Sequence, residues 1–494
     1  MDSKGDSPEE AAKWDGPGEV LDSYGLPGGR AKINIFRSSG NSEIICNVEE
    51  PVLSVREMKE VERLEEMIWT FIPDMAGSSH DLSLDMHSLI ESFIQERMPW
   101  VRGELREKYM YYLNRDFNGY GIIDPLVRDG KIEDISCDGP GIPVFVFHAD
   151  FGSISTNITF PDSVQLSSFI VRLSQMCGKS ISINSPILDG ITRDGHRVEA
   201  IYSGEISGRG PAFTIRLFRE SPFTPTELIH LGTASPEMMS YFWMMVENLN
   251  SALIVGAPGS GKTSALNSIL MFAPSNTKIF SIEDTRELNL PHGNWVAAET
   301  REIERESLTG VSSFGLFDLV KVAMRQRPTY IVVGEVRGRE MYALFQAMAT
   351  GHTIYSTVHA DSMESLMNRL ENEPMNVPKL MISYLNIVIF INFVRKGDKK
   401  VRRITEVDEI AGIDPRTGDI TYNRVFSHDP SGDTFRFSGN SMLLKRIAEQ
   451  RSIPLDDVYA ILQTRAQTLK NLADSEVKYS DLAETMQRSY MEGN

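Results

Sequence analysis

The chain has 494 residues, which is enough for about two to four domains that each bury a core of their own. Its 68 acidic residues outnumber its 50 basic residues, and the resulting net charge of −18 argues against a broad nucleic-acid-binding surface. The three cysteines lie far apart and form no CxxC pair, so we expect a reducing compartment and no zinc site.

The N-terminal quarter of the sequence divides into two segments. Residues 1–30 are rich in glycine, proline and acidic residues, lack the apolar core of a signal peptide, and are predicted to be disordered. Residues 31–120 are predicted to be a helical region, because apolar side chains recur at helical spacing around Val61, Ile90 and Leu113.

An α+β domain is predicted over residues 121–220. The alternation of apolar and polar residues from 144 to 160 predicts two strands joined by a turn, and a helix and further strands follow. Pro222 and Pro225 stand three residues apart. Because proline is disfavoured inside helices and strands, we expect an interdomain linker at residues 221–235.

Residues 236–440 are predicted to form an α/β domain. Strands and helices alternate from 251 to 370, as a mostly parallel sheet requires, and the pattern of residues 386–437 predicts antiparallel strands. The polar residues 441–494 are predicted to be a helical C-terminal tail. The apolar stretch 380–394 is too short and too polar to span a bilayer, so we expect any membrane association to go through a partner.

The most specific motif is Gly-Ala-Pro-Gly-Ser-Gly-Lys-Thr at residues 256–263, a complete GxxxxGK[ST] phosphate loop. An apolar run precedes it and a helical pattern follows, so the helix would point its positive N-terminal end at an anion. Lys262 would reach the β- and γ-phosphates, and the Thr263 hydroxyl would bind Mg²⁺. We predict that the chain binds a nucleoside triphosphate through Gly256, Ala257, Pro258, Gly259, Ser260, Gly261, Lys262, Thr263 and Ser264.

Two later apolar strands end in acidic residues, at the strand ends where parallel sheets place ligand-contacting groups. The first leads to Glu283 and Asp284. Glu283 is a candidate for orienting or deprotonating the water that attacks the γ-phosphate, and a capping role for the acid pair is the alternative. The second leads to Glu335, which fits a Walker B strand and would serve Mg²⁺, if only through water, although many such strands end in aspartate. The sequence leaves open whether Glu335 also assists catalysis.

His352 and His359 flank the next strand, residues 353–358. A histidine beside a strand is usually structural, but two that bracket the strand after the Walker B helix favour phosphate sensing, mainly by His359. We do not expect the two imidazoles to share a metal, because seven residues along a strand exceed ~20 Å.

Several arginines complete the set of candidates. Arg197 and Arg216 lie on or near strands of the predicted α+β domain, and an arginine from another domain or subunit can neutralise charge in the transition state. For any single arginine, solvation or a local ion pair is the alternative. Four more flank the Walker B strand: Arg325, Arg327, Arg337 and Arg339.

Four segments, in this order, resemble the signatures of the secretion ATPase superfamily. They are the phosphate loop GAPGSGKT, the Asp box IEDTRELNLPH, the atypical Walker B region MRQRPTYIVVGEVRGRE and the His box TGHTIYSTVHA. The stretches GYGIIDPLVRDGKIEDISCDGPGIPVFVFH and FTIRLFRESPFTPTELI are similar to the archaeal branch of the type II/type IV secretion system ATPases, which includes pilus and archaellum assembly ATPases. The resemblance covers about residues 115–410 and does not include the tetracysteine zinc motif of many bacterial members.

The resemblance implies an α/β fold with a C-terminal RecA-like P-loop ATPase domain and an N-terminal α+β domain preceded by a helical unit. It implies a homohexameric motor that uses ATP and Mg²⁺. Such a motor would act on a polytopic membrane platform protein and on pilin-like or archaellin-like assembly machinery, at the cytoplasmic face of the cell membrane.

The same resemblance assigns roles residue by residue. Glu283 becomes the implied catalytic acid or base, Glu335 the Mg²⁺-associated acid and His359 the sensor of the γ-phosphate. Arg197 and Arg216 become the implied arginine fingers, ahead of the arginines beside the Walker B strand.

Two other classes of function are weighed against this motor. A nucleic-acid motor would need a basic surface, but the basic residues from Arg395 to Arg403 are better explained as a solvated hairpin tip, because no stacking aromatic residues interleave with them. A non-catalytic, ATP-gated scaffold is disfavoured because Glu283 and Glu335 are retained. We therefore expect catalysis and no nucleic-acid partner.

Overall fold

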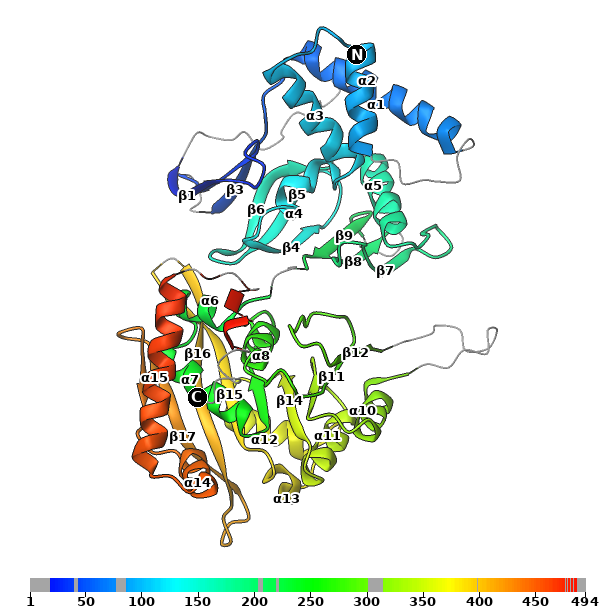
Figure 1. Cartoon of the computed structure of the whole chain (residues 1–494). Helices are drawn as coiled ribbons and strands as arrows, with labels where there is room; N and C mark the ends of the chain where they lie inside the picture. Colours follow the sequence, from blue (N-terminus) through cyan, green and yellow to red (C-terminus); the bar gives the residue numbers. More distant parts are fainter. Residues whose placement is uncertain are drawn as a thin grey trace, which may run out of the picture. The chain divides into compact units, whose positions relative to one another are not determined.

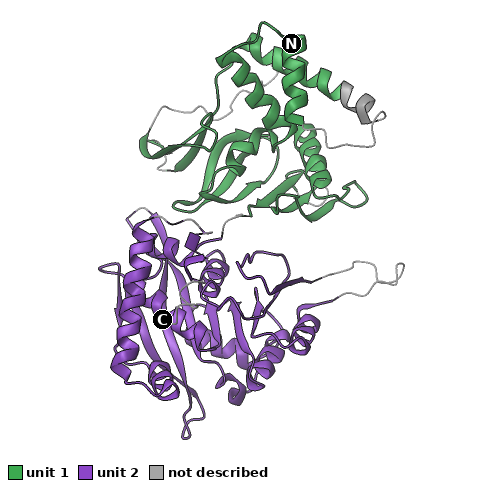
Figure 2. Cartoon of the chain, in the orientation of Figure 1, with its two compact units in different colours: residues 1–219 green, residues 220–494 purple. Residues whose placement is uncertain are grey.

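The computed structural model describes residues 18–39, 43–76, 86–202, 208–218, 222–300, 314–397 and 399–475, with 477, 479, 481–482 and 484–486. The chain forms two compact units, residues 1–219 and residues 220–494 (Figure 2). Each unit contains a nine-stranded sheet with helices packed on it (Figure 1), which confirms the predicted α/β class. Within the described ranges, no helix combines the length and apolar character needed to cross a membrane.

The sheet of the first unit has the order β1-β2-β3-β6-β5-β4-β9-β8-β7 and is antiparallel apart from the parallel pair β3–β6. Buried residues such as Ile135, Val146 and Ile215 pack in one core with the apolar face of α5 (Ser163–Met176). The strands are β1 (Glu19–Gly25), β2 (Lys32–Arg37), β3 (Ile44–Glu49), β4 (Ile132–Cys137), β5 (Pro143–His148), β6 (Gly152–Thr159), β7 (Ile187–Ile191), β8 (Arg197–Ile201) and β9 (Ala212–Arg216).

The first three strands correct two predictions about the N-terminal region. β1 lies within the segment predicted to be disordered, and β2 and β3 lie within the segment predicted to be helical. Ile33 and Ile35 of β2 are fully buried, and Cys46 of β3 pairs with Thr156 of β6, about 110 residues later. Such short strands are stabilised by distant partners rather than by a local pattern, so a search for helical spacing does not find them. The predicted disorder of residues 1–17 lies outside the described residues.

A helical cluster follows these strands, in the region where apolar spacing predicts helices. Its core contains Leu64, Ile90 and Leu113, one from each of the three main helices. The helices are α1 (Val55–Ala76), α2 (Met86–Arg97) and α3 (Glu104–Phe117), and the short turns η1 (Gly121–Ile123) and α4 (Asp124–Val127) lead from them into β4.

The sheet of the second unit has the order β12-β11-β13-β14-β10-β15-β16-β17-β18. The strands from β12 to β15 are parallel and those from β15 to β18 are antiparallel, as the alternation in the sequence predicts. They are β10 (Ala252–Val255), β11 (Ile279–Glu283), β12 (Trp295–Glu299), β13 (Tyr330–Val333), β14 (Thr353–Val358), β15 (Ile387–Lys396), β16 (Lys399–Ile413), β17 (Ile420–Asp429) and β18 (Thr434–Phe437).

Helices cover both faces of this sheet, so every residue of the parallel strands β10, β11, β13 and β14 is buried, including polar residues such as Ser281 and Ser356. Leu253 and Val255 of β10 pack in one core with α10 to α13, whereas Ala252 and Ile254 pack in a second core with α7, α8, α14 and α15. The helices are α7 (Pro236–Glu247), α8 (Lys262–Leu270), α10 (Leu316–Arg325), α11 (Glu340–Ala349), α12 (Met363–Glu371), α13 (Lys379–Ile382), α14 (Met442–Arg451) and α15 (Leu455–Asp474).

The predicted linker at residues 221–235 contains a helix, α6 (Pro225–His230), with Leu228 buried. Pro225 begins this helix rather than breaking it, because proline at the first helical position lacks only an N–H that would have no partner there. Thr224 and Glu227 complete the N-terminus with a reciprocal capping box.

The predicted C-terminal tail is helical, but it is part of the second unit's core. Leu444 and Ile447 of α14 and Leu469 of α15 are buried in the cluster that contains α7. An ion pair of 2.8 Å between Arg465 Nη1 and Glu247 Oε2 also joins α15 to the end of α7. The sequence did not predict this buried position, because α15 is amphipathic and most of its surface is polar.

Candidate functional site

The segment Gly256–Thr263 joins β10 to α8 at the carboxyl end of the parallel strands. Gly259 and Gly261 have φ angles of 70° and 94°, in the left-handed region that glycine adopts without strain. No side chain caps the N-terminus of α8, so the first N–H groups of this helix remain directed toward the loop. A loop of this shape before a helix N-terminus fits a phosphate group.

Gly256 lies where no side chain fits. A Cβ atom built on it would lie 2.2 Å from the carbonyl oxygen of Ile391 and 2.6 Å from Oγ of Ser260. Because one of these neighbours is backbone of β15, the close approach of loop and strand requires glycine here.

We expect Gly256→Ala to lower the free energy of unfolding by about 1–3 kcal/mol, because the added methyl group forces β15 or the loop to move. Chemical denaturation of the full chain measures this change. The matched control is Gly293→Ala, since a Cβ on Gly293 meets no atom within 4 Å. Equal stabilities of the two variants would show that the approach of Ile391 to the loop is looser than described.

Lys262 folds its side chain back over the loop from the first turn of α8. Its Nζ donates to the carbonyl oxygen of Ala257 at 2.9 Å and lies 3.1 Å from Nδ1 of His359. The residue is only 7% exposed, and burial lowers the pKa of its ammonium group to about 8. The loop carbonyl and the imidazole thus hold this ammonium group beside the phosphate loop.

His359 connects Lys262 to Glu335 across the ends of β13 and β14. Its Nε2 lies 2.8 Å from Oε1 of Glu335. A protonated ammonium group can only donate, so Nδ1 accepts from Lys262 and the neutral ring donates from Nε2 to Glu335. Burial, and then the charge of Lys262, lowers the pKa of His359, which agrees with a neutral ring. The three residues form one hydrogen-bonded chain.

Glu335 has an ionised carboxylate that two other side chains hold. Arg337 donates to both of its oxygens, from Nε at 2.6 Å and from Nη2 at 3.0 Å. Burial on its own would raise the pKa of Glu335, but the hydrogen bonds from Arg337 and the charges around it lower that pKa below its ordinary value. Arg337 therefore forms a local ion pair, which is the alternative given above for a single arginine.

The oxygen donors at this point fit Mg²⁺, which prefers carboxylate, hydroxyl and water ligands. Glu335 provides an ionised carboxylate, and the Thr263 hydroxyl belongs to the first turn of α8. Among the residues that the structure describes, no group of three or more His, Cys, Asp and Glu side chains could hold a metal ion.

Glu283 ends β11 with a buried carboxyl group, 3% exposed. Its Oε1 accepts the N–H groups of Glu287 and Leu288 at 2.9 and 3.0 Å, so the capping alternative applies to one of its oxygens. Burial raises the pKa of Glu283 to about 7 despite these hydrogen bonds. A Cβ on Gly334 would lie 3.0 Å from Cγ of Glu283, so Glu283 packs against the residue that precedes Glu335.

Asp284, the second acid of the predicted pair, is exposed and has a different environment. Its Oδ1 accepts from the Thr300 hydroxyl at 3.0 Å.

His352 also lies outside the chain of contacts around Lys262. It precedes β14, whereas His359 follows that strand, and its Nδ1 lies 3.3 Å from Oγ1 of Thr350. The local contact of His352 agrees with a structural role.

Arg197 and Arg216 belong to the first unit, whereas the other candidate residues belong to the second. They are direct partners on β8 and β9, so their side chains share one face of the sheet. Arg197 Nη2 lies 3.5 Å from Asp189 Oδ2 and 3.4 Å from Glu199 Oε1, and Arg216 Nε lies 3.2 Å from Asp134 Oδ1. The two arginines therefore form a cross-strand pair with local acidic partners.

Three further arginines lie near the Walker B strand without joining the contacts around Glu335. Arg325 ends α10, Arg327 follows with a φ angle of 50°, and Arg339 precedes α11. All three side chains are exposed. Their positions do not distinguish them from ordinary surface arginines.

Two arginines on β16 correct the interpretation of the basic residues 395–403 as a solvated hairpin tip. Arg402 donates to the carbonyl oxygen of Gly259 in the phosphate loop, from Nε at 3.0 Å and from Nη2 at 2.9 Å. Arg403 is 4% exposed and pairs with Asp433, with Nε 2.7 Å from Oδ1. The sequence reading missed both contacts, because each partner is far from β16 along the chain. The adjacent arginines within a predicted strand, Arg402 and Arg403, were the feature of the sequence that could have indicated these contacts.

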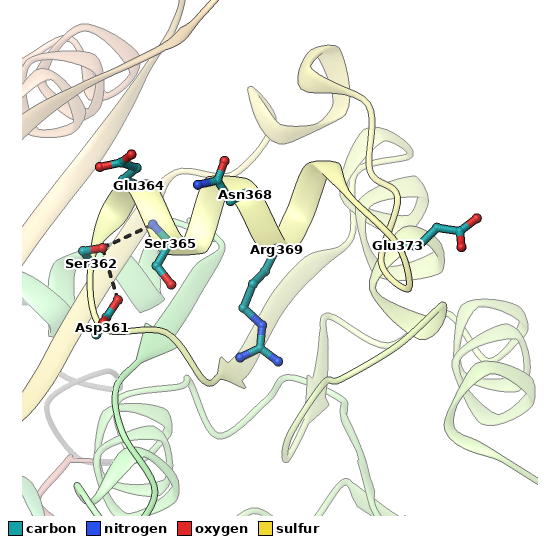
Figure 3. Close-up of a pocket in the computed structure, with 7 residues that line it drawn as sticks. All are labelled: Asp361, Ser362, Glu364, Ser365, Asn368, Arg369 and Glu373. Carbon is teal, nitrogen blue, oxygen red and sulfur yellow. Dashed lines mark hydrogen bonds between the residues drawn. The ribbon is translucent and has the colours of Figure 1, made fainter.

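An open, polar pocket of about 440 Å³ lies along α12 and its flanking loops, and none of the predicted site residues lines it (Figure 3). Arg369 links this helix to the candidate site, because its Nη1 donates to the carbonyl oxygen of His359 at 2.6 Å. The lining residues are Asp361, Ser362, Glu364, Ser365, Asn368, Arg369 and Glu373.

Comparisons with known proteins agree with this arrangement. The sequence model of the family described as "Type II/IV secretion system protein" matches residues 205–470. An uncharacterized protein of Methanocaldococcus jannaschii is 39% identical over 381 residues, which are 76% of this chain and 68% of that protein. A second protein of this archaeon is 43% identical over 265 residues, 52% of this chain and 94% of the relative.

Among solved structures, the Legionella pneumophila ATPase DotB is similar over 78% of this chain and 96% of its own, with 17% identity and a TM-score of 0.44. The family match and the archaeal relatives confirm the family that the four sequence signatures predict. The chain belongs to the type II/IV secretion system protein family.

Proposed function

We propose that this chain is an ATP-hydrolysing motor that powers the assembly of type IV pilus-like filaments or archaella, or type II-like secretion. The observation that carries the proposal is the hydrogen-bonded chain from Lys262 through His359 to Glu335. This chain joins the phosphate loop to the ends of β13 and β14. A bound γ-phosphate would contact groups from three segments, namely the start of α8 and the residues that follow β13 and β14.

Each of these residues has a part in the proposed reaction. The loop N–H groups and Lys262 bind the β- and γ-phosphates, and His359 detects the γ-phosphate by exchanging its contact with Lys262 for one with phosphate. Glu335, with the Thr263 hydroxyl, would hold Mg²⁺, which when bound supplies positive charge that offsets the charge of the phosphates. Glu283 accepts a proton from the attacking water, because its raised pKa makes it a stronger base than an ordinary carboxylate.

A pH profile tests the role of Glu283. We expect kcat/KM for ATP to rise with pH through about 7, because the carboxylate form of Glu283 is the base, and to fall again above about 8, because Lys262 then loses the ammonium charge that binds the phosphates. Steady-state rates in buffers of constant ionic strength measure this profile. A flat profile between about pH 6 and 8 would contradict the assignment.

Homohexameric assembly and arginine fingers are further parts of the proposal. Arg197 and Arg216 would provide positive charge to the transition state from the first unit, of the same or of a neighbouring subunit. Association with a polytopic membrane platform protein would place the motor at the cytoplasmic face of the cell membrane. These parts rest on the family and on the motif positions.

Arg197→Ala is expected to lower kcat of the assembled protein by about tenfold or more while nucleotide binding is kept, because an arginine finger acts mainly on the transition state. Arg216, its cross-strand partner, would supply part of the missing charge, so Arg197→Ala/Arg216→Ala is expected to lose more. Arg209→Ala is the control, since Arg209 belongs to the same unit but to a turn before β9. Full activity of the double variant would make both residues structural.

The choice of substrate for the motor is tested by its response to partners. We expect ATP turnover of the purified full chain to increase when a detergent-solubilised polytopic platform protein is added, and to stay unchanged when single- or double-stranded DNA is added. Salt-sensitive DNA binding together with DNA-stimulated turnover would favour the nucleic-acid motor instead.

A further inference from the structure

The hairpin of β15 and β16 borders the phosphate loop on the side opposite to β14. β10 lies between β14 and β15 in the sheet, and β15 continues past the end of β10. On the β14 side, Gly256 N–H donates to Val358 and Lys262 contacts His359. On the β15 side, the loop meets Ile391 and Arg402. The loop is therefore held from two sides by separate groups.

Arg402 itself is fixed by the strand that carries it. It stands directly opposite Phe393 in the β15–β16 pair, and its guanidinium carbon lies 5.2 Å from the centre of the Phe393 ring. A guanidinium group favours an aromatic face, and its planar set of donors keeps a fixed direction. Both Nε and Nη2 of Arg402 then reach the same acceptor, the carbonyl oxygen of Gly259.

The peptide unit between Gly259 and Ser260 is consequently held at both ends. Its carbonyl oxygen accepts from Arg402, and its N–H donates to the carbonyl oxygen of Ala257 at 3.2 Å. Turning this peptide over changes ψ of Gly259 and φ of Ser260, and glycine, which has no Cβ, allows a wide range of ψ at its positive φ of 70°. An unrestrained Gly259 would therefore allow this peptide to turn over. Turning it would redirect the polar groups that shape the loop.

We infer that Arg402 is a positioning residue of the nucleotide site, which keeps the phosphate loop in its binding conformation before a nucleotide arrives. The inference rests on the proposed nucleotide-binding function. Preorganisation of this kind lowers the entropy that a ligand must remove when it binds, so its main effect is on affinity. Arg402 is half-exposed, and its removal leaves no cavity in the core.

Calorimetric titration of the full-length protein with Mg–ADP tests this inference. Arg402→Ala is expected to weaken binding by roughly 10- to 30-fold, the size expected when charged hydrogen bonds that order a loop are lost. At saturating ATP, kcat of this variant is expected to stay within about threefold of the wild type, because Arg402 does not touch the reacting atoms. Arg402→Lys, which keeps the charge but lacks the paired donors, is expected to recover only part of the affinity.

Arg395→Ala is the matched control. Arg395 lies on the same hairpin and carries the same charge, but its Nε donates to Gly397 within its own turn at 3.2 Å. Equal affinities of the wild type and Arg402→Ala, or equal losses in Arg402→Ala and Arg395→Ala, would overturn the inference. If the wild type itself does not bind Mg–ADP, the proposed nucleotide site has failed, which is a separate result.

Discussion

Lys262→Ala is expected to abolish ATP hydrolysis and to weaken Mg–ATP binding by about 30- to 1000-fold. The ammonium group of Lys262 lies at the loop, where it contacts the Ala257 carbonyl and the His359 ring. Phosphate oxygens offer this group stronger, charge-assisted hydrogen bonds, and truncation of one partner of such a pair typically costs a factor of this size. Equilibrium binding and phosphate release measure the two effects.

The control for this variant is Lys278→Ala. Lys278 belongs to the same unit, but it is partly exposed and donates to the carbonyl oxygen and side chain of Gln326 at 3.2 and 3.1 Å. It is expected to bind and hydrolyse ATP as the wild type does. Unchanged turnover in Lys262→Ala, with an intact fold by circular dichroism, would show that the phosphate loop does not bind the ATP that is hydrolysed.

Glu283→Gln is expected to lower kcat by about 10²- to 10⁴-fold, the usual contribution of a general base, and to leave ATP binding almost unchanged. The amide oxygen of glutamine can still accept from the N–H groups of Glu287 and Leu288, so the turn after β11 is kept. What the variant loses is the ionisable carboxyl group with its raised pKa. Single-turnover hydrolysis separates this chemical effect from binding and product release.

Asp284→Asn is the matched control for Glu283→Gln, because Asp284 is the next residue, is exposed, and accepts a hydrogen bond from the Thr300 hydroxyl. It is expected to keep most of the wild-type rate. If Glu283→Gln keeps its kcat while Glu335→Gln loses it, the role of base belongs to Glu335, and Glu283 remains as a cap for the turn.

The second unit was largely predictable because its signals are local. A phosphate loop between a strand and a helix, followed by apolar strands with acidic ends, specifies a parallel sheet and the edge where its site lies. Glu283 packs against Gly334, the residue before Glu335, and His359 contacts both Lys262 and Glu335, at the edge that this reasoning indicates. The roles of these residues stay predictions.

The features that the sequence did not reveal depend on distant partners. β3 pairs with β6 across about 110 residues, and Arg402 reaches Gly259 across 143 residues, so no short window contains both sides of either contact. The helix that begins at Pro225 was not predicted for a different reason. Proline is a helix breaker inside a helix but a helix starter at its first position, and only the capping residues Thr224 and Glu227 distinguish the two cases.

The most direct test of the account is the release of phosphate from Mg–ATP by the purified full-length chain. We expect steady phosphate release by the wild type that stops when Mg²⁺ is chelated and that is absent in Lys262→Ala. Binding of ATP without phosphate release, under conditions where the protein is assembled and folded, would contradict it and would favour an ATP-gated scaffold.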